Sequence, residues 1–81
     1  MHNEISFVSN ELNTDNEIVK ILIFEALCSD LTTIHFDSSC NKIRGTTSMK
    51  NINDAEKILN LMLLQLKDCK FSFCYLNLFF K

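Results

Sequence analysis

The sequence predicts a single α+β domain over residues 1–81, with the element order β-α-β-β-α-β and two helices on one face of an antiparallel sheet. Two segments place apolar residues at helical spacing behind helix-capping residues, and four shorter segments resemble strands. A chain of 81 residues supports one small core. Together these observations favour the split βαβ arrangement of ferredoxin-like folds.

The N-terminal part of the chain predicts one strand and one helix. Residues 4–8 alternate between apolar and polar side chains, as in a strand with one buried face. Thr14 and Glu17 then form a capping box for a helix over residues 15–28. The β-branched run within this segment is also compatible with a buried strand, but its length and its caps favour the helix.

Residues 31–48 predict a β-hairpin. Residues 31–37 are rich in Thr, Ile and Phe, and residues 42–48 return after a polar loop. We expect Asn41 to take the left-handed position of that loop. Gly45 marks either a bulge or a close approach of backbone.

The most strongly periodic segment covers residues 53–69 and predicts the second helix. Asn53 and Glu56 form its start signal. Leu61 and Leu64 extend the apolar surface beyond a single stripe. This helix therefore needs cover on more than one side, and a second subunit is one source of that cover.

Residues 71–80 predict the last strand. Both of its faces are apolar, so we expect a fully covered strand. The sequence leaves open whether this segment is an internal strand or is donated to another chain.

Composition narrows the functional classes. The net charge is −2 and no basic block is present, which argues against strong direct binding of nucleic acid. With one Gly and no Pro, a Gly-rich phosphate loop is excluded. No secretory signal and no membrane span is apparent, so we expect an intracellular protein, cytoplasmic or nuclear.

No cluster of residues predicts catalysis, a cofactor or a metal site. Cys40 and His35 are the plausible nucleophile and base, but they should lie on opposite sides of a turn, without a third group to orient them. His35 also lacks Cys or His partners at zinc-binding spacing. Of the cysteines, we expect Cys40 to be exposed, and Cys28, Cys69 and Cys74 to be small buried residues. The chain is predicted not to be an enzyme.

The apolar excess is the feature that points to function. More apolar side chains are present than one small core hides, and large exposed apolar patches usually mark partner surfaces. The alternative is that both helices bury deeply and the last strand closes the sheet. The predicted partner interface comprises Phe24, Leu61, Leu64, Leu76, Leu78 and Phe80.

Two segments carry a resemblance to a known family. Residues 5–7 (Ile-Ser-Phe) and 24–30 (Phe-Glu-Ala-Leu-Cys-Ser-Asp), followed by a hairpin and a helix, resemble the small dimerising subunit of the KEOPS complex, the family that includes the cancer/testis antigens. The strand over residues 71–80 is an addition to that pattern. The resemblance implies a non-catalytic subunit that dimerises and docks, through its last helix, on the catalytic subunit of a tRNA threonylcarbamoyl-adenosine modifying assembly.

Residues 32–56 also resemble one half of a TATA-box-binding-protein-like repeat, although Thr46-Thr47 stands where that family has Thr-Gly and basic residues are few. We expect a protein–protein interaction or dimerisation subunit of a larger assembly, working as a homodimer or in a hetero-complex. The alternative is a small acidic inhibitor or adaptor, of the kind made by a virus or mobile element, that binds a host nucleic-acid-processing enzyme.

Overall fold

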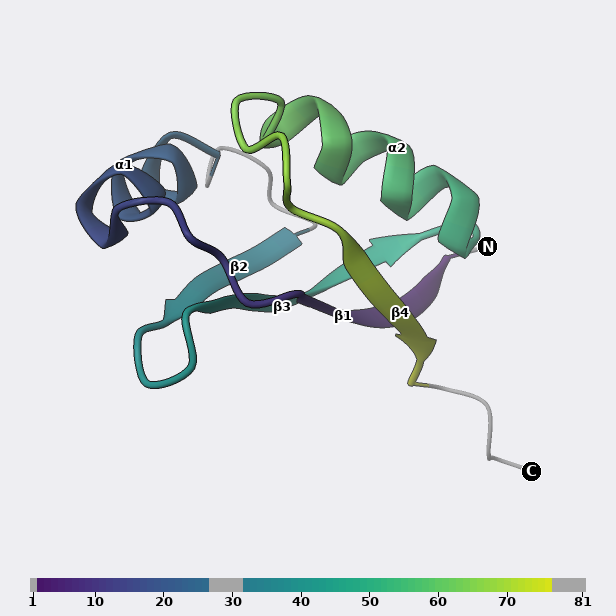
Figure 1. Cartoon of the computed structure of the whole chain (residues 1–81). Helices are drawn as coiled ribbons and strands as arrows, with labels where there is room; N and C mark the ends of the chain where they lie inside the picture. The colour runs from purple at the N-terminus through teal and green to yellow at the C-terminus, as the bar shows by residue number, and fades with distance from the viewer. Residues whose placement is uncertain (1, 27–31, 77–81) are drawn as a thin grey trace.

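A four-stranded antiparallel sheet carries both helices on one side in the computed structural model, which describes residues 2–26 and 32–76 (Figure 1). The strand order is β2-β3-β1-β4, and every neighbouring pair is antiparallel. The predicted fold class is therefore confirmed. The elements are β1 (Asn3–Ser9), α1 (Asn16–Ala26), β2 (Thr32–Asp37), β3 (Lys42–Met49), α2 (Ile52–Met62) and β4 (Phe71–Tyr75).

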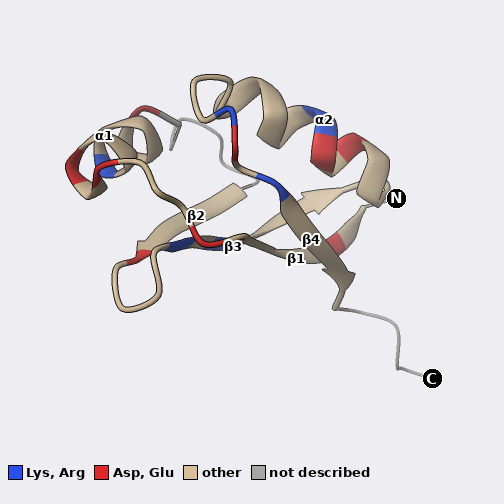
Figure 2. Cartoon of the chain, in the orientation of Figure 1, with Lys and Arg blue, Asp and Glu red and all other residues tan. Residues whose placement is uncertain are grey.

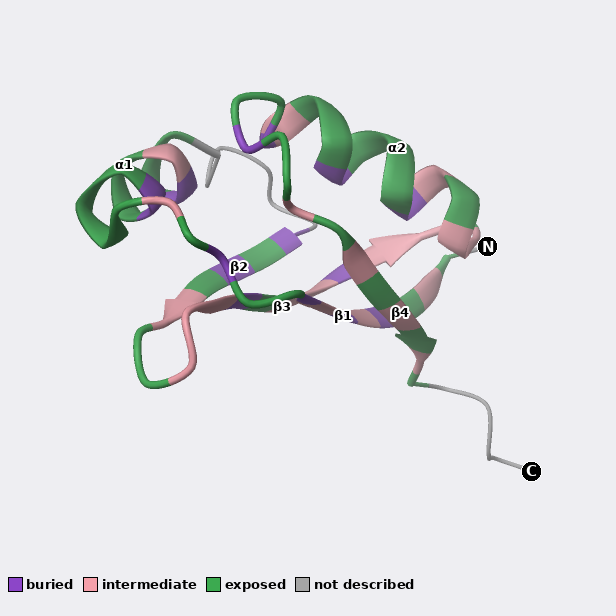
Figure 3. Ribbon diagram, viewed as in Figure 1, coloured by how far each residue is buried: buried purple, intermediate pink, exposed green. Residues whose placement is uncertain are grey.

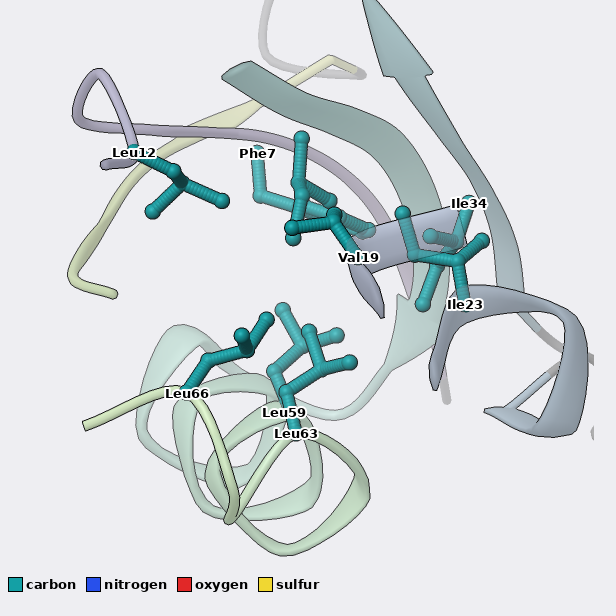
Figure 4. Packing of buried hydrophobic residues seen from close by; sticks show 9 residues of the cluster. Phe7, Leu12, Val19, Ile23, Ile34, Leu59, Leu63 and Leu66 are labelled. Atoms are coloured by element: carbon teal, nitrogen blue, oxygen red, sulfur yellow. The ribbon is translucent and has the colours of Figure 1, made fainter. Parts of the chain in front are cut away.

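The core lies between the sheet and the helices (Figure 4). Strand alternation turns Ile5 and Phe7 of β1 inward, as predicted, and both are buried. The two helices and the turns that follow α2 cover these residues from one side. Other core residues are Leu12, Val19, Ile23, Ile34, Ile43, Leu59, Leu63 and Leu66.

The β2–β3 hairpin forms as predicted. Asn41 has a φ of 56°, the left-handed conformation that Asn tolerates in turns. The Ser39 hydroxyl donates to Asp37 Oδ1 at 2.5 Å. This hydrogen bond is the main reason that the pKa of Asp37 falls to about 2. Gly45 marks a close approach, because a Cβ there would lie 1.9 Å from the Thr33 carbonyl oxygen.

Both helix starts differ from the prediction. Asp15, and not Thr14, provides the observed bond at the start of α1, accepting from the Glu17 N–H at 2.8 Å. At α2 the cap is Asn51, whose side chain accepts from the Asp54 N–H at 2.9 Å. Several polar residues stand at each helix start, and the three-residue spacing to a glutamate, used alone, predicted the wrong capping residue in both cases.

The second helix is also shorter than predicted, ending at Met62 instead of residue 69. Distant contacts explain the difference. The Asn10 side chain donates to the Asp68 carbonyl oxygen at 3.0 Å and accepts from the Lys70 N–H at 2.6 Å. These bonds hold the chain in a turn that leads directly into β4, and Leu66 reaches the core from that turn.

The prediction of a fully covered last strand is wrong for the described residues. β4 lies at the edge of the sheet and pairs with β1 alone among the described strands. Ser72 and Cys74 point to the helix-free face and are exposed, so Cys74 is not the buried residue that was expected. Tyr75 points inward, and its hydroxyl accepts from the Ile52 N–H at 3.1 Å, tying β4 to the start of α2.

Candidate interaction surface

The outer side of α1 carries large apolar side chains. Ile18, Ile21 and Phe24 repeat every third residue, opposite the buried Val19 and Ile23. Phe24 is 78% exposed, and the other two are more than half exposed. We name these three exposed residues the α1 patch.

The outer side of α2 and the turn after it repeat this arrangement. Leu61 is 69% exposed and Leu64 is 72% exposed. Leu59, on the inner side of the same helix, is fully buried. Ile58 adds a further exposed apolar side chain. We name Ile58, Leu61 and Leu64 the α2 patch, and Figure 3 shows the exposed outer surface of this helix.

Three of the predicted interface residues, Phe24, Leu61 and Leu64, are thus strongly exposed. Leu76 follows β4 and is also exposed. Leu78 and Phe80 lie outside the described residues. Ile18, Ile21 and Ile58 were not predicted to be surface residues. The three-residue spacing of Ile18 and Ile21, on the side of the helix opposite Val19, was the signal that indicated their exposure.

A groove runs between α2 and the chain that enters β4. It has a volume of about 410 Å³, and Leu64 of the α2 patch lies at its rim together with Leu66 and Phe71. Cys69 also lines it, and burial raises the pKa of this thiol to about 11. This groove extends the apolar character of the α2 patch toward the edge of the sheet.

The opposite, helix-free face of the sheet has a different chemistry. Ser6, Thr33, Thr46 and Ser72 contribute hydroxyl groups to it, and Thr33 and Thr46 bond across the strands at 2.9 Å. Arg44 lies on this face and pairs with Asp37 at 3.4 Å. The alternation of the four strands places no Phe, Tyr or Trp of the described residues on this face. Among the described residues, this face therefore carries no aromatic platform of the kind on which single-stranded nucleic acid stacks.

The structure gives no support to the pair Cys40 and His35. The contacts of Cys40 Sγ are to Arg44 and to the Asp37 carbonyl oxygen, each at 3.9 Å, and Cys40 is half-buried instead of exposed. His35 sits opposite Arg44 in the β2–β3 register. Within residues 2–26 and 32–76, no three Cys, His, Asp or Glu side chains gather where they could hold a metal ion.

Charge does not organise either helical patch. Figure 2 shows acidic residues near the start of both helices, where they complement the helix dipole. Glu17 also pairs with Lys20 at 3.7 Å on the surface of α1. In the part of the chain that the structure describes, no helix is both long enough and apolar enough to cross a membrane.

Comparison of the chain with protein-family models, with curated proteins and with solved structures finds no match. The resemblances to the KEOPS subunit and to the TATA-box-binding-protein-like repeat therefore stay predictions from the sequence. The fold and the two exposed helical patches carry the functional argument.

Proposed function

We propose that this chain is a non-catalytic interaction subunit that docks on another protein through the apolar outer surfaces of its helices. The observation that carries the proposal is the strong exposure of Phe24, Leu61 and Leu64, three large apolar side chains on two separate elements. Isolated exposed apolar residues are common, but groups of them, such as the α1 patch and the α2 patch, are typical of a partner surface.

The energetic argument uses the same residues. Fully burying one leucine or phenylalanine side chain stabilises a complex by about 1.5–3 kcal/mol before association costs are subtracted. Two such side chains at the centre of an interface are enough to act as its main anchors. Mixed charges around the patches would form the polar rim that such interfaces usually have.

The assembly implied by the sequence resemblance is a tRNA threonylcarbamoyl-adenosine modifying complex, and we keep it as the specific form of this proposal. It rests on residues 5–7 and 24–30 and on the predicted role of the last helix as a contact surface. The exposed Leu61 on α2 and Leu64 in the turn directly after it are compatible with that role. The direct check is whether the purified chain binds the catalytic subunit of such a complex in a titration.

The general proposal is tested by comparing partners captured from the source cells by matched variants. Leu61→Asp with Leu64→Asp places charge in the α2 patch, whereas Lys57→Asp changes charge one helical turn away from Leu61. We expect the leucine variant to lose at least tenfold of a stoichiometric partner that the wild type and Lys57→Asp retain. All three proteins should melt at similar temperatures, because the substituted residues are exposed.

Equal capture by all three proteins would contradict the proposal. A partner that dissociates at high salt and ignores the leucine substitutions would instead favour the acidic inhibitor or adaptor. That result would move the contact surface from the leucines to the acidic residues.

A further inference from the structure

The outer edge of β4 offers backbone groups for a further strand. Leu76 donates its N–H to the Glu4 carbonyl oxygen at 2.8 Å, and Asn10 donates to the Lys70 carbonyl oxygen at 3.0 Å. These bonds fix the phase of the β1–β4 ladder, so the even-numbered residues of β4 turn their backbone groups toward β1. The outward-facing N–H and C=O groups of β4 therefore belong to Phe71, Phe73 and Tyr75.

The side chains of the same three residues are incompletely covered. Phe71 packs edge-on against Phe7 with ring centroids 5.4 Å apart, and Phe73 lies 6.4 Å from Phe7. Phe71, Phe73 and Tyr75 nevertheless remain only half-buried. Phe7 packs against Phe71 and Phe73 from the side of β1, and no described strand lies on the other side of β4.

Within Phe71–Tyr75, the edge also carries none of the protecting residues that are usual at such positions. Sheet edges are normally blunted by charged residues, proline or a bulge, because their free backbone groups template the addition of another strand. Phe71–Tyr75 contains no charged residue and no proline, and its register with β1 is continuous. The strand at the opposite edge, β2, ends in the charged residue Asp37.

We propose that two copies of this chain pair through β4, antiparallel, with the two-fold axis at Phe73. In this register Phe73 pairs with Phe73 of the second copy, and Phe71 pairs with Tyr75 of the second copy. All outward backbone groups of Phe71–Tyr75 are then hydrogen-bonded, because each of these pairs exchanges two bonds. Shifting the register leaves some of these groups without a partner in Phe71–Tyr75 of the second copy.

Side chains favour the same arrangement. Residues opposite one another lie on the same face of the sheet, so the half-buried aromatic side chains meet across the axis on the helix side. Aromatic cross-strand pairs stabilise antiparallel sheets, and no like charges oppose each other along this strand. The result is a continuous eight-stranded sheet with all four helices on one side.

This dimer is independent of the proposed function. It uses the edge of β4 and leaves the α1 patch and the outer α2 residue Leu61 available to a different protein. In the dimer each copy would present its own helical patches, so two docking surfaces would lie on the same side of the extended sheet.

Charge placed on the edge tests the register. In the proposed dimer Ser72 lies opposite Cys74 of the second copy, and both residues are exposed in the single chain. Ser72→Lys with Cys74→Lys therefore opposes like charges, whereas Ser72→Lys with Cys74→Glu opposes unlike charges. By light scattering across a concentration series, we expect two chains for the wild type and for the Lys/Glu variant, and one chain for the Lys/Lys variant.

Disulfide trapping gives a second measurement that does not depend on charge. Opposite residues in a non-hydrogen-bonded pair have Cα atoms about 4.5 Å apart, which suits a disulfide. In a background of Cys28→Ala, Cys40→Ala and Cys69→Ala, adding Ser72→Cys should give a covalent dimer with oxidised glutathione. The same background with Cys74 alone should not, because the two Cys74 residues would be diagonal neighbours about 7–8 Å apart.

The outcomes separate this dimer from the helical interface. A monomeric wild type at every concentration, or equal masses for both lysine variants without a Ser72→Cys cross-link, overturns the β4 dimer. Cross-linking through Cys74 alone overturns the register centred on Phe73. Leu61→Asp should leave the cross-link intact, so loss of partner capture in that variant reports on the helical surface alone.

Discussion

The two sides of the helical layer use the same residue types for opposite purposes. On the inner side, Leu59 and Leu63 are buried against the sheet, whereas on the outer side Leu61 and Leu64 face solvent. α1 repeats the contrast, with Val19 buried and Phe24 exposed. The apolar content of this chain therefore divides into a part that folds the domain and a part that the domain does not need for its own core.

This division shows why composition misleads when it is used alone. A helix that is apolar on all sides is normally buried on all sides. Here the sheet provides one covering surface, and residues 2–26 and 32–76 supply no further layer on the other side. Leu61 and Leu64 are consequently exposed on the surface, and replacing them should leave the fold in place.

The largest effect is expected from a substitution within the sheet, at the close approach between β2 and β3. Gly45→Ala places a Cβ 1.9 Å from the Thr33 carbonyl oxygen and 2.6 Å from Phe7 Cζ. Because the nearer atom is backbone, it cannot move aside as a flexible side chain would. We expect a loss of about 3 kcal/mol or more, at or above the upper end of the usual range for overpacking, and a largely unfolded variant by circular dichroism.

The control for this substitution is Ser48→Ala, in the same strand but on the helix-free face. We expect its melting temperature to stay close to that of the wild type. A Gly45→Ala protein that melts like this control would show that β2 and β3 separate easily, and the close approach would lose its importance.

The second prediction compares one buried and one exposed leucine of α2 directly. Leu59→Ala removes a fully buried side chain and should reduce the free energy of unfolding by about 2–5 kcal/mol. Leu61→Ala should change it by about 0.5 kcal/mol or less, because Leu61 is exposed. Urea denaturation of the two proteins at a concentration that favours the monomer measures both values.

Similar losses for the two leucines in that experiment would mean that Leu61 is buried in solution. The contrast between the sides of α2 would then fail for the single chain. If Leu61→Ala becomes more destabilising as protein concentration rises, the difference would report on association instead of folding.

How far the sequence predicted this molecule depends on the range of the interactions. The element order, the buried face of β1 and the left-handed Asn41 follow from local periodicity and turn chemistry, and they were predicted correctly. The end of α2 and the position of β4 depend on Asn10 and Tyr75, which act over about 60 and 20 residues of chain respectively. Periodicity within a segment carries no record of such contacts.

The candidate surface was predictable for the same reason and to the same limit. Leu61 and Leu64 lie outside the main apolar stripe, so helical spacing alone was enough to name them as candidates for the exposed surface. The exposure of β4 residues was not predictable, because an apolar strand at a sheet edge and one at its centre have the same alternation. Sheet order is needed to tell them apart.

The third prediction concerns the N-cap of α2, which the sequence placed at Asn53 and the structure places at Asn51. Asn51→Ala removes the acceptor of the Asp54 N–H and should cost about 1 kcal/mol. Asn53→Ala should cost less than half of that, because Asn53 is exposed within the first turn. Thermal melts of the two variants decide between the caps, and a larger loss for Asn53→Ala would restore the start expected from the sequence.

The smallest effect concerns Cys69, which lines the groove between α2 and the chain that enters β4. Burial raises the pKa of its thiol from 9.0 to about 11, whereas Cys74 is exposed on β4. Since the thiolate is the reactive form, iodoacetamide at pH 8.5 should label Cys69 at least several-fold more slowly than Cys74, as measured by peptide mass spectrometry.

The same raised pKa of Cys69 makes the stability of the fold depend on pH. The thiol of the unfolded chain ionises first, so the stabilising contribution of neutral Cys69 is complete below about pH 9 and is lost as the pH rises toward 11. Cys69→Ala should flatten this alkaline part of the stability profile, and Cys74→Ala should leave it unchanged. Equal labelling of the two cysteines would place Cys69 in open solvent, and the groove would then belong to the exposed surface instead of the boundary of the core.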